Sequence, residues 1–284
     1  MDENLRVLFG VWLFLMGLAV GSFLNVVICR LPKEQSLGGR SRCPRCGKEL
    51  LSRDLVPIVS QLLLRSRCRF CGEKFSWRYL VVELLTGLIF VGLYAYLGLD
   101  RLPELVTFLV TFAALFALFI IDWETTLIPY ELWLVILIAG VGHDVYGLAT
   151  GTREMTRVFS YATATGEGVF CLPQSVAGII VGGLGLRLFV FLADLAFRKE
   201  TMGFGDIYLT AAAGAHFGPG LALILYIVIA AFLGAAIGGA QMALSRGKRT
   251  DTVIPFGPFL AVAMALLLLA GDRIVPAVRG FLFP

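Results

Sequence analysis

Seven long apolar segments dominate this 284-residue sequence and limit what it can fold into. Each is about as long as the roughly 20 mainly apolar residues that a helix needs to cross a lipid bilayer. Because 58% of the residues are hydrophobic and only 15% are charged, a water-soluble fold is excluded for most of the chain. The segments cover residues 8–29, 79–98, 104–121, 131–149, 174–193, 219–244 and 253–271.

The sequence therefore predicts an all-α polytopic membrane protein with about eight transmembrane helices, since a shorter apolar run at 206–217 is either an eighth span or a half-helix. Residues 1–30 are expected to form an uncleaved first transmembrane helix, because no small-residue cleavage site follows. Residues 31–78 form a polar insert between helices 1 and 2, and residues 79–284 form the transmembrane bundle. A second polar stretch, 150–172, has little periodicity and is predicted to be a loop.

The distribution of charge orients the chain. The insert carries eleven Lys and Arg residues against four Asp and Glu residues, and further basic residues gather at 198–199 and 246–249. Positively charged loops of membrane proteins stay in the cytoplasm, so we expect a cytoplasmic insert. The net charge of +4 then reports this topology and contact with membrane lipid, and not binding to nucleic acid.

Two CxxC pairs stand in the insert, and 21 residues separate them. Such turns can place four thiolates tetrahedrally around one Zn²⁺ at about 2.3 Å. Disulfides are disfavoured in the cytoplasm, so a metal is the better prediction for these cysteines. The zinc either only folds the insert or also shapes access for a substrate, and the spacing does not choose between these roles. The predicted ligands are Cys43, Cys46, Cys68 and Cys71.

Two acids at the ends of apolar segments are the candidate catalytic residues. An ionisable group at the centre of a span raises the free energy of membrane insertion by about 2.5–3.5 kcal/mol, so each such group indicates a structural or functional role. Asp122 ends the apolar run 115–121, and Asp206 follows Gly203-Phe204-Gly205 and begins the run 206–217. Both are predicted at the cytoplasmic membrane boundary. The two glycines would let the backbone leave helical geometry and admit another chain. The alternative for Asp206 alone is an N-cap carboxylate.

Two facing carboxylates can hydrolyse a peptide bond. At about 3 Å and an effective dielectric constant of 20 they repel by roughly 5 kcal/mol, so they retain one shared proton. The ionised member can then take a proton from water while the protonated member polarises a carbonyl group. His143 and His216 are predicted on the outer side and offer no nucleophile–histidine pair. Two other functions stay open at this point, a transporter whose acids relay ions and a noncatalytic membrane scaffold.

An ordered set of motifs over nearly the whole chain resembles the bacterial type IV prepilin peptidases, which are prepilin leader peptidases/N-methyltransferases of the GxGD class of membrane aspartyl proteases. These motifs accompany the two CxxC pairs: Gly21–Val27 with Arg30-Leu31-Pro32, Asp54–Pro57, Ser76–Tyr79, Val82–Gly87, Ile121-Asp122 with Ile128-Pro129, Gly203–Asp206 and Ile254–Phe259.

The resemblance implies that Asp122 and Asp206 are the catalytic pair, with Gly203 and Gly205 supporting the active-site loop. It implies prepilin or pseudopilin substrates of type IV pilus or type II secretion systems, with a basic leader, Gly before the scissile bond and usually Phe after it. It further implies an inner-membrane location, and methylation of the new N-terminus with S-adenosylmethionine as donor. The insert and neighbouring residues are associated with methylation, and Glu83 is carried over as a substrate or methylation residue.

Two positions depart from the family pattern. Relatives usually have Pro-Asp where this chain has Pro129-Tyr130, and they often have Lys where this chain has Tyr208. Both changes alter the local charge without replacing a presumed catalytic acid. We expect a basic leader to be recognised by nearby acids, namely Glu124, Glu131 and Glu200.

Overall fold

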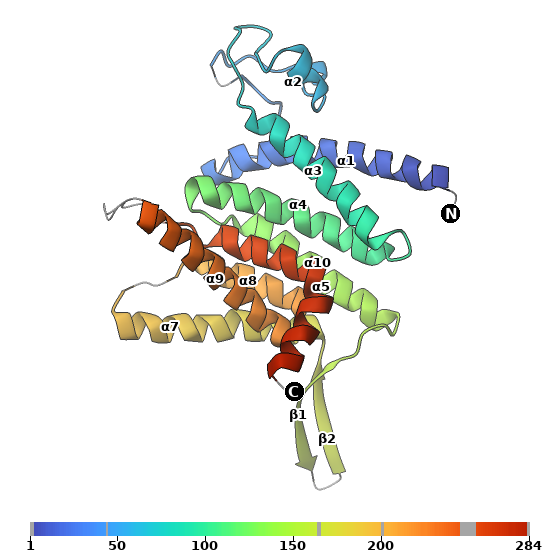
Figure 1. The fold of residues 1–284 in the computed structure, drawn as a ribbon, viewed down its shortest axis with the longest axis vertical. Coiled ribbons are helices and arrows are strands. Elements are labelled where there is room, and N and C mark those ends of the chain that lie inside the picture. The colour runs from blue at the N-terminus through green and yellow to red at the C-terminus, as the bar shows by residue number, and fades with distance from the viewer. Residues whose placement is uncertain (1–2, 44, 164–165, 200–201, 245–253, 283–284) are drawn as a thin grey trace. The chain divides into compact units, whose positions relative to one another are not determined.

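The computed structural model describes residues 3–43, 45–163, 166–199, 202–244 and 254–282. It is mostly helical, which confirms the predicted fold class (Figure 1). Within these residues, seven helical segments are long and apolar enough to cross a membrane, one for each long apolar run. They are Glu3–Lys33 (α1 and the turn η1), Arg78–Leu97 (α3), Leu102–Thr125 (α4), Tyr130–Ala149 (α5), Gln174–Phe197 (α6, η3 and α7), Leu221–Leu244 (α9) and Gly257–Leu282 (α10).

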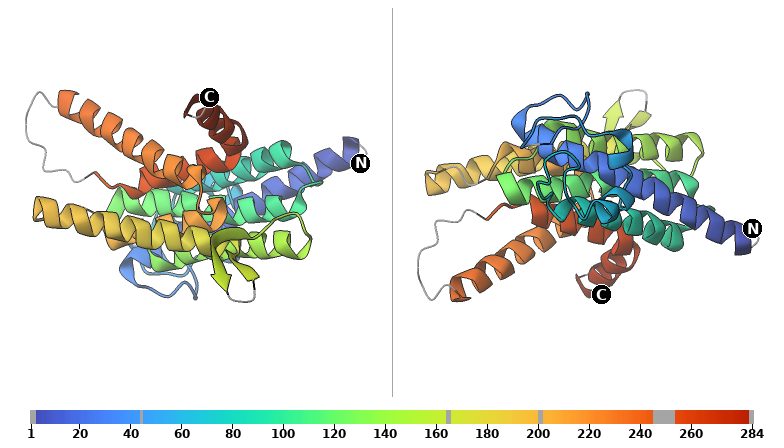
Figure 2. Two further views of the ribbon diagram at one scale, coloured as in Figure 1. Left: turned by 90° about the horizontal axis from the view of Figure 1, so that it is seen from below. Right: turned by 90° about the horizontal axis from the view of Figure 1, so that it is seen from above.

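The chain divides into two compact units, residues 1–113 and 114–284, with the boundary inside α4. In the N-terminal unit, α1 (Glu3–Arg30) packs along α3 (Arg78–Leu97) (Figure 1, Figure 2). Glycines make the contact close: a Cβ atom added at Gly17 would lie 2.8 Å from Gly87 Cα, and one at Gly21 would lie 2.7 Å from Glu83 Cα. Small residues of this kind let membrane helices approach backbone to backbone, and here they bring Glu83 against α1.

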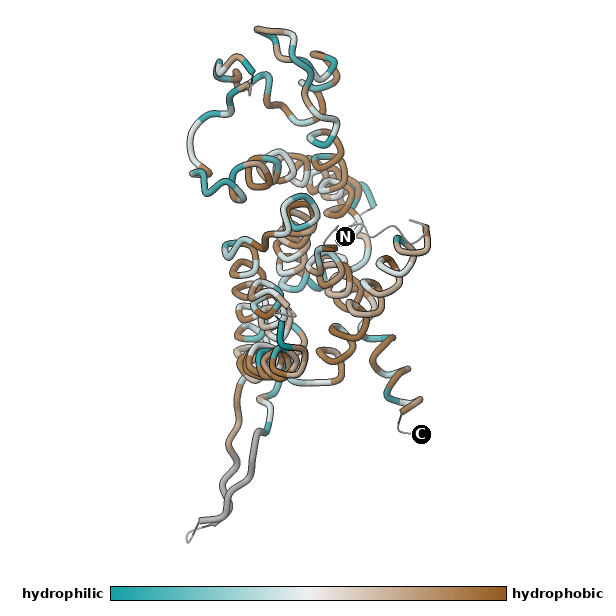
Figure 3. The backbone as a smooth tube through the Cα atoms, turned by 90° about the vertical axis from the view of Figure 1, so that its left-hand side faces the viewer, coloured by the Kyte–Doolittle hydropathy of each residue, from teal (hydrophilic) through white to brown (hydrophobic). Residues whose placement is uncertain are grey.

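The insert between α1 and α3 contains little regular structure. It holds two 3₁₀ turns, η1 (Leu31–Lys33) and η2 (Ser52–Asp54), and one short helix, α2 (Val59–Leu63). Two isolated β-bridges, Arg42 with Glu49 and Arg67 with Lys74, each close a loop around one CxxC pair. Hydrophilic residues gather in this segment, whereas the long helices are mostly hydrophobic (Figure 3).

The helix α8 (Phe204–Phe217) is the centre of the C-terminal unit, where it contacts α5, α6, η3 (Val181–Gly185), α9 and α10. It corresponds to the short apolar run, and its 14 residues span about 21 Å. This is less than the roughly 30 Å of a bilayer core. Its contact with α6 is a backbone contact, because a Cβ atom added at Gly178 would lie 1.9 Å from the Gly214 carbonyl oxygen.

A β-hairpin replaces the loop predicted at 150–172, so that prediction was wrong. The strands β1 (Thr156–Thr163) and β2 (Gly166–Leu172) pair antiparallel, from Thr156 with Leu172 to Thr163 with Gly166 (Figure 1). A register shift lies between Arg157 and Phe159 and interrupts the regular alternation. Strand stability comes from cross-strand pairs, which a single-strand pattern with an irregularity does not reveal.

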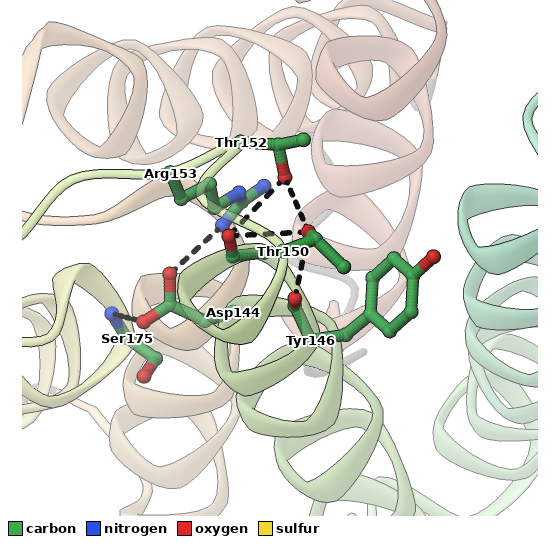
Figure 4. A network of polar contacts seen from close by, with 7 residues as sticks. Asp144, Tyr146, Thr150, Thr152, Arg153 and Ser175 are labelled. Carbon is green, nitrogen blue, oxygen red and sulfur yellow. Dashed lines mark hydrogen bonds and ion pairs between the residues drawn. The ribbon is translucent and has the colours of Figure 1, made fainter.

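A polar network joins the segment between α5 and the hairpin, residues 150–153, to α5 and α6 (Gln174–Ile180) (Figure 4). The Asp144 carboxylate is fully buried on α5 and accepts a hydrogen bond from the Ser175 backbone amide at 2.8 Å. It also accepts one from Arg153 Nη1 at 3.3 Å. Its charge is therefore partnered, as a buried carboxylate requires. Thr150 Oγ1 donates to the Tyr146 carbonyl oxygen at 2.9 Å and closes the end of α5.

Some predictions fall outside what the structure describes. The basic residues Arg246, Lys248 and Arg249 and the acid Glu200 lie outside the described residues. The division of the chain at residues 30 and 78 into a first helix, an insert and a bundle stays a prediction.

Candidate active site and metal centre

Asp122 lies in the last turn of α4, just before a tight connection to α5. The Thr126 backbone amide donates to the Asp122 carbonyl oxygen at 2.8 Å, and Thr126 then adopts a left-handed φ of 56° that ends the helix. Pro129 is the N-cap of α5, so only a few residues separate the two helices. The Asp122 side chain points inward, and the residue is only 4% exposed.

The start of α10 faces the Asp122 carboxylate. A Cβ atom added at Gly257 would lie 2.5 Å from Asp122 Oδ2, so any larger residue here would displace the carboxylate. The Gly257 backbone amide is within hydrogen-bonding range of the carboxylate. Asp122 Oδ2 itself is buried and has no hydrogen-bond partner among the described residues. A buried oxygen of this kind costs free energy until a proton, water or substrate satisfies it.

Asp206 lies in the first turn of α8. Gly203 is the N-cap residue with an extended backbone (φ −72°, ψ 152°), so Asp206 stands three positions after the cap and is not the cap itself. Its carboxylate reaches back toward the Gly203 amide, as acidic side chains at this position do. Gly205 lies within the helix, so the backbone does not leave helical geometry there, contrary to the prediction. The absence of a side chain at Gly205 allows close packing instead.

One side chain, Ile128, contacts both glycines that flank the acids. A Cβ atom at Gly205 would lie 2.8 Å from Ile128 Cβ, and one at Gly257 would lie 3.0 Å from Ile128 Cδ1. Asp122 and Asp206 are therefore brought into one region of the C-terminal unit. Sequence analysis named the acids but assigned no role to Ile128 or Gly257.

Glu83 lies in the other unit and has different partners. It is 4% exposed on α3 and accepts hydrogen bonds from the Ile58 backbone amide at 2.8 Å and from Gln61 Nε2 at 3.5 Å. Ile58 has a φ of 59°, a conformation that is strained for a β-branched residue. Glu83 thus holds the insert segment around Ile58 in place. No sequence signal singled out Ile58 or Gln61.

The four cysteines of the insert come together, and their sulfur atoms all lie within 4.8 Å of one another. Tetrahedral ligands at about 2.3 Å from a zinc ion stand about 3.8 Å apart. The Sγ atoms of Cys43 and Cys71 are separated by 3.7 Å, which fits this geometry. Gly47 and Gly72 adopt a left-handed φ of 69° and 72° and close the two turns onto the Cys43 and Cys68 carbonyl oxygens. This donor set could hold zinc.

The surroundings of Cys43 and Cys71 shift the pKa values of their thiols in opposite directions. The Cys46 backbone amide has the largest effect on Cys43 and lowers its pKa to about 7. At Cys71 the Glu73 backbone amide favours the thiolate, but burial and the three neighbouring sulfur atoms outweigh it and raise the pKa to about 12. A bound cation would favour the thiolate form of all four cysteines. An ion pair between Arg45 and Glu73 links the two CxxC turns.

Comparisons with known proteins place the chain in a family. Residues 15–97 match the family described as Bacterial Peptidase A24 N-terminal domain, and residues 109–239 match the Type IV leader peptidase family. A prepilin leader peptidase/N-methyltransferase of Burkholderia pseudomallei is 34% identical, with coverage of 90% of this chain and 84% of the relative. The chain belongs to the prepilin leader peptidase/N-methyltransferase family.

Other relatives carry the same name. The one of Aeromonas hydrophila is 33% identical over 92% of this chain and 90% of its own length. The one of Myxococcus xanthus is 38% identical over 85% of this chain, but the match spans only 65% of that relative. No solved structure matches the chain significantly.

Family membership identifies the chain as a multi-pass membrane enzyme of the aspartic peptidase class, and not a transporter or a scaffold. The ring of His216 makes a 3.0 Å hydrogen bond to the Ile136 carbonyl oxygen. Of the two departures from the family pattern, Tyr208 stacks on Trp133 with ring centroids 5.0 Å apart. The other, Tyr130, is 65% exposed at the start of α5.

Proposed function

We propose that this protein cleaves the basic leader from type IV prepilins or pseudopilins, and that Asp122 and Asp206 are its catalytic pair. Family membership supports the reaction class. The observation that carries the residue assignment is the common neighbourhood of the two acids around Ile128, together with the unsatisfied Asp122 Oδ2.

The proposed chemistry uses one proton shared between two carboxylates. The ionised acid takes a proton from water, and the resulting hydroxide bonds to the carbonyl carbon of the scissile peptide. The protonated acid donates its proton to the carbonyl oxygen. When the tetrahedral intermediate collapses, the C–N bond breaks and the nitrogen takes the proton that the first acid removed from water. A hydroxyl group of the intermediate returns its proton to the second acid, which yields a carboxylic acid and a new N-terminal amine. Gly205 and Gly257 let Ile128 and the start of α10 pack closely beside the two acids, and Gly203 gives the chain before Asp206 its extended backbone.

We further propose that the protein methylates this new amine. The relatives' names include N-methyltransferase, and S-adenosylmethionine would supply an electrophilic methyl group when bound. The amine nitrogen must lose its proton before it can accept the methyl group, and a carboxylate such as Glu83 is a suitable residue for holding that proton.

The same proposal covers metal and location. Zn²⁺ bound by Cys43, Cys46, Cys68 and Cys71 would stabilise the insert. The excess of basic residues in the insert supports an inner-membrane protein whose insert and catalytic acids face the cytoplasm. Glu124 and Glu131, beside the α4–α5 turn, are proposed to attract the basic leader.

Single substitutions test the catalytic pair. Asp122→Asn and Asp206→Asn are each expected to reduce leader cleavage of a coexpressed prepilin by a factor of at least about 100, since each removes an acid–base group. Asp272→Asn, on an exposed residue of α10, is the matched control and should cleave normally. Wild-type cleavage in either variant would refute the mechanism, provided that both variants insert into the membrane. Mass spectrometry of the mature N-terminus tests methylation separately.

A further inference from the structure

A fully buried tyrosine hydroxyl lies where α9 packs on α8. Tyr226 on α9 has an exposed fraction of 0%, and its hydroxyl oxygen has no hydrogen-bond partner among the described residues. Its ring lies against Phe217 at the end of α8, with ring centroids 6.2 Å apart. A buried polar group without a partner raises the free energy of the folded chain, especially in a membrane, where water cannot replace the partner. The proposed peptidase chemistry leaves this hydroxyl without a role.

A second buried hydroxyl, that of Thr210 on α8, is a polar neighbour of Tyr226. Thr210 is also fully buried, and its Oγ1 donates to the Asp206 carbonyl oxygen at 2.8 Å. A carbonyl oxygen can only accept, so this bond uses the one hydroxyl proton of Thr210. Thr210 Oγ1 can still accept through its lone pairs, and the phenolic group of Tyr226 has a proton to donate. The two hydroxyls are therefore complementary in one direction, from Tyr226 to Thr210 and on to Asp206.

Close packing holds Thr210 in place. A Cβ atom added at Gly182 in η3 would lie 2.8 Å from the Thr210 carbonyl oxygen and 3.5 Å from Leu223 Cδ2. Leu223 lies one turn before Tyr226 on α9 and is 3% exposed. At the level of Thr210, α8 is thus packed against η3 and α9 together. The Thr210 hydroxyl is therefore a rigid link between α9 and the backbone of Asp206.

This link ends on the peptide group of a proposed catalytic acid. In an α-helix the Asp206 carbonyl oxygen also accepts from the amide four residues later, which is the Thr210 amide. A hydroxyl that adds a second bond to such an oxygen tilts the peptide group and bends the helix. Asp206 lies in the first turn of α8, where the backbone amides have no partner within the helix. The direction of its carboxylate therefore depends on how this peptide group is held.

We infer that Tyr226 is a positioning residue for the proposed peptidase reaction, an inference that rests on Asp206 being a catalytic acid. The Tyr226 hydroxyl donates to Thr210 Oγ1 and keeps the Thr210 hydroxyl turned toward the Asp206 carbonyl oxygen. This chain of two hydroxyls fixes the first turn of α8, and hence the direction in which the Asp206 carboxylate points. Because both side chains are fully buried, neither touches the substrate, and both act on the chemical step and not on substrate binding.

Cleavage of a prepilin by the purified full-length protein in detergent tests the inference. Tyr226→Phe removes only the hydroxyl, and Thr210→Val keeps the shape of the side chain without its hydroxyl. Each variant should lower kcat per folded chain about fivefold, the effect of one neutral hydrogen bond, with KM unchanged. Thr210→Ser keeps the hydroxyl and should retain the wild-type kcat. The double variant should be no slower than Thr210→Val alone, because the two hydroxyls act as one chain.

The matched control is Tyr146→Phe, which removes the hydroxyl of a tyrosine that is 49% exposed on α5 and should cleave like the wild type. Thermal unfolding gives the folded fraction of every variant. A wild-type kcat per folded chain in Tyr226→Phe would overturn the inference, even if its melting temperature is lower, because the hydroxyl would then serve stability alone. Equal losses in Thr210→Ser and Thr210→Val would also overturn it, and this pair decides the question if Tyr226→Phe does not fold.

Two further outcomes separate this inference from its premise. Losses in kcat that add up in the double variant would show that the two hydroxyls act independently, which contradicts the chain. Normal cleavage by Asp206→Asn would refute the catalytic pair itself. Loss of cleavage in Asp206→Asn together with a wild-type kcat in Tyr226→Phe would refute only the positioning role, and the proposed function would stand.

Discussion

Replacing Gly257 by alanine should inactivate the peptidase without unfolding it. The added Cβ atom would lie 2.5 Å from Asp122 Oδ2 and 3.0 Å from Ile128 Cδ1. Both atoms are ends of side chains, so they can move while the backbone stays in place. Gly257 is also the first residue of α10, where alanine is a better helix former than glycine by about 1 kcal/mol.

The size of the effect follows from the geometry. Ordinary van der Waals contact begins near 3.4 Å, so Asp122 Oδ2 must move by about 0.9 Å from its present 2.5 Å. A displacement of about 1 Å in a catalytic group can cost about 100-fold in rate, which corresponds to about 2.7 kcal/mol of transition-state stabilisation. We therefore expect kcat/KM for leader cleavage to fall about 100-fold.

Purified protein and a prepilin substrate in detergent provide the assay, with kcat/KM from cleavage kinetics and thermal unfolding as the check on folding. Gly271→Ala is the matched control on the same helix, because a Cβ atom there meets nothing within 4 Å. A folded Gly257→Ala protein with the activity of Gly271→Ala would show that the position of the Asp122 carboxylate does not matter for cleavage.

Three further predictions concern the rest of the molecule. Cys68→Ser should reduce bound zinc from about one ion per chain, as measured by mass spectrometry of the metal. The control variant Cys171→Ser should keep its zinc, and equal zinc in both variants would exclude the Cys₄ site. Gly178→Ala forces backbone atoms apart and should lower the free energy of unfolding by at least about 1–3 kcal/mol in thermal unfolding. Gly185→Ala is the control, because a Cβ atom there meets nothing within 4 Å, and equal melting temperatures of the two variants would contradict the close packing. The ion pair to Arg69 holds the pKa of Asp54 below its usual value, so Asp54 stabilises the insert above about pH 4 and loses this effect as the pH falls through the lower folded pKa. The difference in protease resistance between the wild type and Asp54→Asn should therefore shrink in acid, and a difference independent of pH would refute this origin.

The membrane spans were predictable because the bilayer imposes one local requirement on each of them. A helix such as α4 must be apolar over about 20 residues whatever its neighbours are, so its sequence alone reveals it. The CxxC turns are equally local, and the structure gathers the four sulfur atoms as their spacing predicts. The motif Gly203–Asp206 identified an acid at the start of a helix, and α8 does begin at Phe204.

Features that depend on distant partners could not be predicted in this way. The hairpin depends on cross-strand pairs such as Thr156 with Leu172, and the sequence of one strand does not identify the other. The sequence shows Gly257 only as a glycine near the start of a helix, and the folded chain is needed to reveal its contact with Asp122. Asn25 and Gln61 come from segments that are separated by the whole first half of the insert, so only the folded chain shows that they line one cavity.

The glycine contact between α6 and α8 has a consequence for how substrate can enter. Main-chain atoms of Gly178 and Gly214 meet with no side chain between them, so α8 has no compressible layer on that flank and cannot slide or roll toward α6. The helix that bears Asp206 is therefore the fixed wall of the proposed site. At the start of this helix the side chain of Ile128 contacts Gly205, so an incoming polypeptide that reaches Asp206 from there must displace that side chain.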